Sequence, residues 1–177
     1  MPSVAAGNKV WVPAQKRPDE NPYELAEVLS TDPLKVFLVA DGTFSMPKES
    51  EVSLANVGTE VDNCNLLMIS DATLLANTCE RFVADSIYTF TGTIVTSVNP
   101  CKPLPELYSE AAMGASLADR HSAKAPQPHI FHTAESAYET LLSGGRDQSI
   151  VVSGISGAGQ TEAINVSLTS SLSRLPW

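Results

Sequence analysis

The sequence has few cysteines and no long apolar run. Three cysteines, Cys64, Cys79 and Cys101, occur among 177 residues, and none forms a C-x-x-C pair. This favours a reduced, intracellular protein over a disulfide scaffold. No stretch approaches the ~18 consecutive apolar residues of a membrane span, and the first residues lack the basic start and apolar core of a secretory signal. We therefore expect a cytoplasmic protein with no membrane span.

Basic residues are also scarce. The chain has 11 Lys and Arg against 20 Asp and Glu, which gives a formal net charge of −9. An acidic surface argues against broad binding to nucleic acid or anionic membranes. It does not exclude one local phosphate pocket, because backbone N–H groups can supply positive potential there. His129 and His132 lack a neighbouring cysteine or carboxylate cluster, so we do not expect them to form a metal site.

The first 58 residues have the composition of short β-strands separated by proline and glycine. Residues 35–39 are apolar and β-branched, and Asp41-Gly42 is a hairpin signal before a return strand at 43–46. Residues 24–29 suit either a strand or a helical turn. This pattern predicts a small β-barrel.

The remainder alternates between helix and strand patterns. Ser70-Asp71 is a helix cap, and apolar residues at helical spacing follow it. The predicted helices are 71–83 and one that begins at Pro128 and ends at 143–145; the predicted strands lie within 86–98, which turns at Gly92, and at 148–153, which should be buried. Leucines after residue 163 have a spacing that also suits a helix.

Residues 154–162 read GISGAGQTE, which has the spacing of the phosphate-binding loop G-x-x-x-x-G-K-[ST] except that Gln160 replaces the lysine. A preceding strand and a following helix are the context that such a loop requires. Its glycines let N–H groups converge on an anion, and the helix start adds its positive dipole end. Thr161 would bring a hydroxyl to Mg²⁺. A strand-to-helix turn packed with small residues is the alternative interpretation of these nine letters.

Several segments, taken in order, resemble the beginning of a myosin heavy chain, whose head carries G-E-S-G-A-G-K-T-E. Each further motif is weak alone, but their ordered succession is specific. They are Val10–Pro13 (the V-W-V-P opening of a small SH3-like barrel), Ile87–Gly92 (I-Y-T-Y-T-G), Asn99–Pro105 with Tyr108 (the purine-side N-P-[YF]-K-x-[LI]-P…Y), Pro128–Phe131 (P-H-I-F) and Asp147–Ile150 before the loop.

The resemblance implies an α/β fold: a partial P-loop NTPase motor head at 59–177, preceded by an SH3-like β-barrel at 1–58. It implies ATP and Mg²⁺ as cofactors, actin as the family's partner and a cytoskeletal location. No catalytic side chain is implied. The implied nucleotide-binding residues are Asn99, Pro100, Lys102 and Tyr108 on the adenine side, and Gly154, Ile155, Ser156, Gly157, Ala158, Gly159, Gln160, Thr161 and Glu162 around the phosphates, with Thr161 as the Mg²⁺ ligand.

The chain also departs from the family pattern. Gln160 offers an N–H donor without the lysine's charge, and Cys101 replaces an aromatic residue beside the purine. The resemblance fades after Ala163, ahead of the family's switch segments and actin-binding surfaces. We therefore expect weakened ATP binding, severely reduced hydrolysis, and exposed sheet edges and apolar faces. A non-catalytic binding or scaffold protein, or a truncated gene product with a vestigial nucleotide site, remain alternatives.

Overall fold

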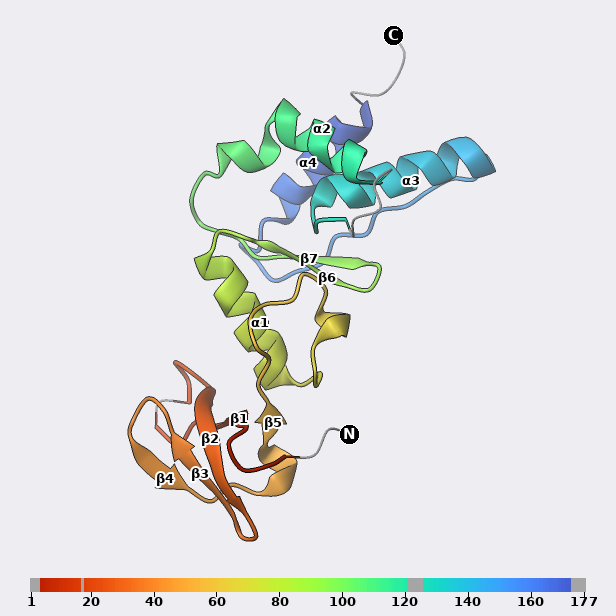
Figure 1. The fold of residues 1–177 in the computed structure, drawn as a ribbon. Coiled ribbons are helices and arrows are strands. Elements are labelled where there is room, and N and C mark those ends of the chain that lie inside the picture. The colour runs from red at the N-terminus through yellow and green to blue at the C-terminus, as the bar shows by residue number, and fades with distance from the viewer. Residues whose placement is uncertain (1–3, 17, 121–125, 173–177) are drawn as a thin grey trace. The chain divides into compact units, whose positions relative to one another are not determined.

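A computed structural model describes residues 4–16, 18–120 and 126–172 (Figure 1). The chain divides into two compact units, residues 1–81 and residues 82–177. Within the described residues, no helix has the length and apolar composition needed to cross a membrane. The division into domains at residue 58 stays a prediction.

The first unit contains a five-stranded antiparallel sheet with the strand order β4-β3-β2-β1-β5 (Figure 1). This confirms the β-rich prediction for the first 58 residues, and the ambiguous segment 24–29 lies within a strand. The hairpin signal at Asp41-Gly42 does connect two strands, with Gly42 at φ 66°. The strands are β1 (Lys9–Pro13), β2 (Tyr23–Thr31), β3 (Leu34–Leu38), β4 (Thr43–Ser45) and β5 (Ser53–Leu54).

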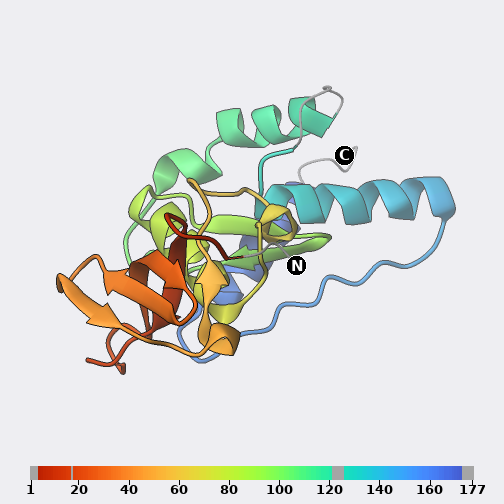
Figure 2. The same ribbon diagram turned by 60° about the horizontal axis from the view of Figure 1, so that its bottom comes forward.

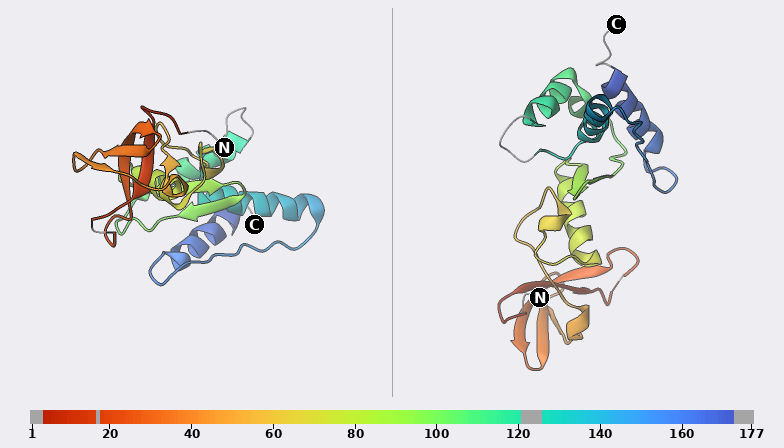
Figure 3. Two further views of the ribbon diagram at one scale, coloured as in Figure 1. Left: turned by 90° about the horizontal axis from the view of Figure 1, so that it is seen from below. Right: turned by 90° about the vertical axis from the view of Figure 1, so that its right-hand side faces the viewer.

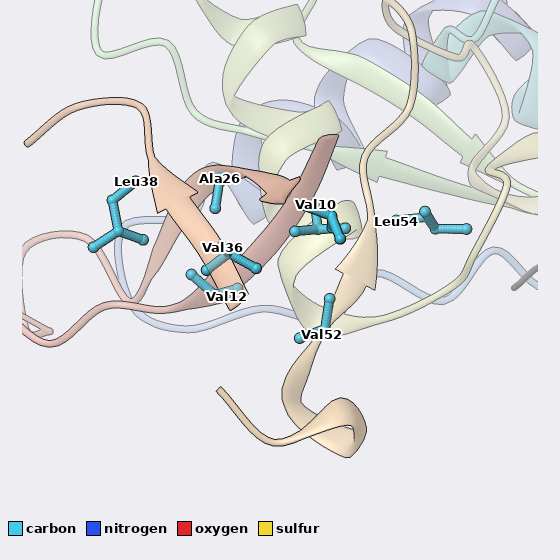
Figure 4. Packing of buried hydrophobic residues seen from close by; sticks show 8 residues of the cluster. Val10, Val12, Ala26, Val36, Leu38, Val52 and Leu54 are labelled. Atoms are coloured by element: carbon cyan, nitrogen blue, oxygen red, sulfur yellow. The ribbon is translucent and has the colours of Figure 1, made fainter. Parts of the chain in front are cut away.

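One face of this sheet forms the core of the first unit. In β1, Val10 and Val12 are buried while Lys9 and Pro13 are exposed, as the two-residue period of a strand requires. Complete burial of an aliphatic side chain of this size contributes roughly 1.5–3 kcal/mol. Figure 4 shows the cluster, which consists of Val10, Val12, Ala26, Val28, Val36, Leu38, Val52 and Leu54.

Helix α1 (Asp71–Val83) has the limits predicted from the sequence. Ser70 caps it, since its hydroxyl accepts the N–H of Thr73 at 3.3 Å. Two short 3₁₀ helices, η1 (Glu49–Glu51) and η2 (Asn63–Asn65), precede it. The buried Asn77 of α1 is bonded to both the N–H and the C=O of Glu60, at 2.8 and 3.0 Å.

In the second unit, the hairpin of β6 (Tyr88–Thr91) and β7 (Ile94–Ser97) turns at Gly92 as predicted. The predicted helix after Pro128 is α3 (Ile130–Gly144), and Gly145 ends it in the left-handed conformation at φ 58°. Helix α4 (Gln160–Leu172) lies beside α3 (Figure 3). Two further elements, the 3₁₀ helix η3 (Pro105–Tyr108) and the helix α2 (Glu110–Arg120), were not predicted.

The prediction of a buried strand at 148–153 is wrong. Residues 145–153 run as extended coil from α3 back toward α4 (Figure 2), and Val151 is 85% exposed. The segment has the β-branched composition of a strand, but a strand also needs a neighbour whose backbone can pair with it. The exposure of Val151, Ile155 (83%) and Ile94 (66%) agrees with the expected exposure of apolar surface.

Candidate functional site

The phosphate-loop motif of the sequence forms a compact glycine turn that leads directly into α4. Gly157 and Gly159 have φ of 83° and 92°, a region that favours glycine. The N–H of Ala158 donates to the carbonyl of Ile155 at 3.1 Å, and that of Ala163 donates to Gly159 at 3.0 Å. Because the latter is an i→i−4 bond at the helix start, the N–H groups of the preceding helical residues lie outside the helical ladder.

Gln160 closes this turn through its side chain. Its Nε2 donates to the carbonyl oxygen of Gly154 at 2.6 Å. A Cβ atom at position 154 would lie 3.0 Å from the Cβ of Ala158 and 3.5 Å from this Nε2, so a larger residue there would fit only if Ala158 moved by a few tenths of an ångström. The residue that replaces the expected lysine thus bonds to the loop itself.

Asn99 joins the loop from the other predicted part of the site. Its Nδ2 donates to the carbonyl oxygen of Gly157 at 2.7 Å, although the two residues lie 58 positions apart. Its Oδ1 accepts the N–H of Cys101 at 2.9 Å, and Cys101 has a positive φ of 51°. The structure therefore brings the Asn99 turn and the glycine loop into direct contact.

The other predicted adenine-side residues have different partners. Lys102 forms an ion pair with Asp85, and both side chains are about half exposed. Pro100 is partly buried. The Tyr108 hydroxyl lies 3.0 Å from that of the buried Tyr88. Burial, together with this hydrogen bond, raises the pKa of Tyr88, so its hydroxyl stays protonated.

His129 supports this tyrosine pair. Its ring centroid lies 4.7 Å from that of Tyr88 and 5.9 Å from that of Tyr108. Nδ1 accepts the N–H of Phe131 at 3.1 Å and thereby caps α3, so the ring proton lies on Nε2, which donates to the carbonyl of Leu107 at 3.0 Å. Burial lowers the pKa of His129 to about 4, and the ring is neutral at pH 7.

The loop residues fit a polyphosphate by geometry but are weak in charge. The N–H of Ala158 is bonded to the carbonyl of Ile155, so the backbone donors that the loop offers an anion are those at the start of α4. Thr161 is exposed on the first turn of α4, where its hydroxyl is available to a metal ion held by the phosphates. Residues 154–162 contain no cationic side chain, and Glu162 adds a negative charge. Such a loop suits an anion whose charge a metal ion partly neutralises better than a free polyanion.

A hollow of about 720 Å³ lies beside the loop in the second unit. Its walls include β7, residues 148–153, part of α3 and the stretch Ala158–Gln160. Its size suits a small molecule. Asn99, Lys102 and Tyr108 do not line it, so this hollow and the adenine side implied by the resemblance are different surfaces.

Tyr88 and His129 support Tyr108 although the sequence pattern does not predict this role for them. The signal for Tyr88 was present, since it lies in the strand motif that resembles the family. His129 belongs to the Pro128–Phe131 motif, and its position just ahead of the apolar stripe is the sequence signal for a cap to α3. Within the described part of the chain, no group of three or more His, Cys, Asp and Glu side chains gathers into a metal site.

Comparison with known proteins gives a consistent result. Residues 60–169 match the model of the myosin head (motor domain) family. The chain is 37% identical to Myosin-13 of Arabidopsis thaliana over 172 residues, which cover 90% of this chain and 11% of that protein. It is 41% identical to human unconventional myosin-VI over 105 residues, or 57% of this chain and 8% of the relative. The Dictyostelium discoideum Myosin-H heavy chain is 35% identical over 159 residues, which cover 87% of this chain and 9% of that protein.

The chain thus spans about a tenth of the length of these relatives. The family match covers more than half of the chain and includes the glycine loop, the Asn99 turn, the β6–β7 hairpin and α3. The ordered motifs of the sequence and this match agree: the chain belongs to the myosin head (motor domain) family.

Proposed function

We propose that this chain is part of an ATP-binding myosin motor head, in which residues 154–162 hold the phosphates of Mg·ATP. The hydroxyl of Thr161 would ligate Mg²⁺, and Pro100, Lys102 and Tyr108 would lie on the adenine side. Bound Mg²⁺ would neutralise phosphate charge that the loop itself cannot. Actin as a partner, a cytoskeletal location and an SH3-like form of the first unit's sheet belong to the same proposal.

The observation that carries this proposal is the contact between the two nucleotide motifs. The Asn99 turn and the glycine loop are remote in sequence, yet a 2.7 Å hydrogen bond joins them at the start of α4. A packing turn of small residues needs no such partner. Family membership supplies the independent support.

We further propose that Gln160 impairs the site. A hydrogen bond to a charged group contributes roughly 1.5–3 kcal/mol, whereas a neutral pair contributes ~0.5–1.5 kcal/mol. One of the two N–H donors of the Gln160 side chain is already bonded to the carbonyl of Gly154, so at most the other is open to a phosphate unless this bond breaks. The loss in a transition state is larger than in the ground state, since charge develops there. We therefore propose that binding is weakened and hydrolysis nearly abolished.

Mg·ATP titration with thermal unfolding tests the proposal. Saturable stabilisation is expected, of about 2.7 kcal/mol when the ligand is at 100 times its dissociation constant. Gln160→Lys should tighten binding about fivefold, which corresponds to roughly 1 kcal/mol. Gln127→Lys is the matched control, because Gln127 is an exposed residue of the same unit and the change adds the same charge. If Mg·ATP stabilises neither the wild type nor Gln160→Lys, the proposal fails.

A non-catalytic binding module is the second candidate function. The bond from Gln160 to Gly154 favours it, because a loop closed by its own side chain does not depend on a ligand for its conformation. This candidate predicts cooperative unfolding of the wild type at a midpoint that Mg·ATP does not change. Retention of a protein partner by both wild type and Gln160→Lys would support it.

A further inference from the structure

We infer that Asn99 is a positioning residue that holds the phosphate loop in place, rather than a residue that reads the adenine base. This inference rests on the proposed function, since it assigns a role within the same nucleotide site. It differs from the adenine-side role that the family resemblance implies for Asn99.

The first support is the set of partners of the Asn99 side chain. Its amide nitrogen donates to Gly157 and its amide oxygen accepts from Cys101. Both ends of the side-chain amide are therefore bound to backbone. The bond to Cys101 closes a turn of the Asx type, which fixes the side chain relative to its own segment.

The second support is the peptide group that Asn99 contacts. The carbonyl of Gly157 and the N–H of Ala158 belong to one planar unit. Asn99 binds the carbonyl end, and the carbonyl of Ile155 accepts from the N–H end at 3.1 Å. The orientation of this peptide plane is thus fixed at both ends.

A glycine loop needs such an external constraint. Gly157, at φ 83°, has access to many backbone conformations, so the peptide plane that follows it could rotate easily. In an anion nest the N–H groups converge on the ligand while the carbonyls point away from it. Here the N–H of Ala158 is already bonded to the carbonyl of Ile155, so the donors left for a ligand are those that follow it, at the start of α4. By holding the Gly157–Ala158 peptide in one orientation, Asn99 sets where those later N–H groups can meet a ligand, without touching the ligand itself.

The consequence is a base-independent effect on binding. If Asn99 acts through the loop, removal of its side-chain amide weakens the binding of every ligand that places phosphates there. If Asn99 contacts adenine, the same change weakens the binding only of ligands that carry the base. ATP and inorganic pyrophosphate, each with Mg²⁺, distinguish the two roles.

The experiment measures the affinity of the full chain for Mg·ATP and Mg·pyrophosphate by calorimetry, and records the Ala158 amide by ¹⁵N NMR without ligand. The Asn99→Ala and Asn99→Asp variants both remove the donor, and Asn99→Asp keeps an acceptor for Cys101. Asn165→Ala, at an exposed position of α4, is the control. We expect both Asn99 variants to bind both ligands about 5- to 10-fold more weakly and to shift the Ala158 ¹⁵N signal, and Asn165→Ala to do neither.

Each other outcome overturns the inference. If Asn99→Ala weakens ATP but not pyrophosphate, Asn99 reads the base. If the Asn99 variants bind both ligands as tightly as the wild type does, or if their Ala158 ¹⁵N signal stays at the wild-type position, the loop does not depend on Asn99. If wild type binds neither ligand, the proposed function itself fails, and that result is distinguishable because it is seen without any substitution. Asn99 is exposed, so loss of folding should not obscure the comparison, and circular dichroism of each variant checks this.

Discussion

Lowering the pH below neutral should destabilise the second unit through His129. Burial lowers the pKa of this ring from 6.5 to about 4, and the hydrogen bond to Leu107 opposes that effect only in part. Protonation would place a second proton on Nδ1, which already accepts the N–H of Phe131. The charged ring would therefore lose the cap of α3 as well as its place in the tyrosine cluster.

The magnitude follows from the difference between the folded and unfolded pKa values. Each pKa unit corresponds to about 1.4 kcal/mol, which sets an upper limit of roughly 3.5 kcal/mol for this shift. Allowing for residual solvent around the ring, we expect about 1–2 kcal/mol. The unfolded chain binds more protons than the folded chain between pH 6.5 and about 4, so stability rises with pH there. The contribution of His129 is complete above pH 6.5 and is lost as the pH falls to about 4.

Urea unfolding followed by circular dichroism, at several pH values across this range, measures the effect. His129→Asn is the control, because asparagine retains an N-cap acceptor but does not titrate. The variant keeps all 20 acidic residues, so the difference between the two pH profiles gives the contribution of the His129 ring to stability. If wild type and His129→Asn lose stability in parallel from pH 7 to 4, the assignment of a buried neutral histidine is wrong.

Two substitutions test other parts of the fold. Asn77→Ala should lower the free energy of unfolding by about 2–4 kcal/mol, because it removes the partner of both backbone groups of Glu60 at a buried position. Asn56→Ala removes only the acceptor of the Leu67 N–H, at 2.9 Å, and should lower the free energy of unfolding by less; equal losses in urea titrations would contradict this reasoning. Gly157→Ala should lower the free energy of unfolding by about 1–2 kcal/mol, because the backbone at position 157 has a positive φ. Gly114→Ala, in open space on α2, should instead stabilise by about 0.5–1 kcal/mol, and two thermal shifts of the same sign would refute the contrast.

The sequence predicted elements whose signals are local. Helix α1 carries its cap at Ser70 and its apolar spacing within a few turns, and the β6–β7 hairpin carries its own turn at Gly92. Helix α2, which was not predicted, also has a local signal, since Ser109 precedes it and its hydroxyl accepts the N–H of Ala112 at 3.1 Å. The failure at 148–153 is of another kind, because pairing partners are not encoded in the segment itself.

The same difference between local and non-local signals holds for the candidate site. The glycine spacing predicted a turn ahead of a helix, and α4 does begin at Gln160. The bonds of Gln160 to Gly154 and of Asn99 to Gly157 could not be predicted, since they depend on side-chain rotamers and on the approach of segments 58 residues apart. Tyr88 and His129 form their cluster for the same non-local reason.

The bare extended segment ahead of the glycine loop has a consequence for how the protein behaves at high concentration. Ile150, Val151 and Val152 form a short β-branched ribbon, and Val151 is almost wholly in water. The net charge of −9 keeps neighbouring molecules apart only over the electrostatic screening distance, which is about 10 Å at 0.1 M salt. Raising the ionic strength should therefore promote edge-to-edge self-association, seen as an increase in light scattering, and Val151→Lys should suppress it.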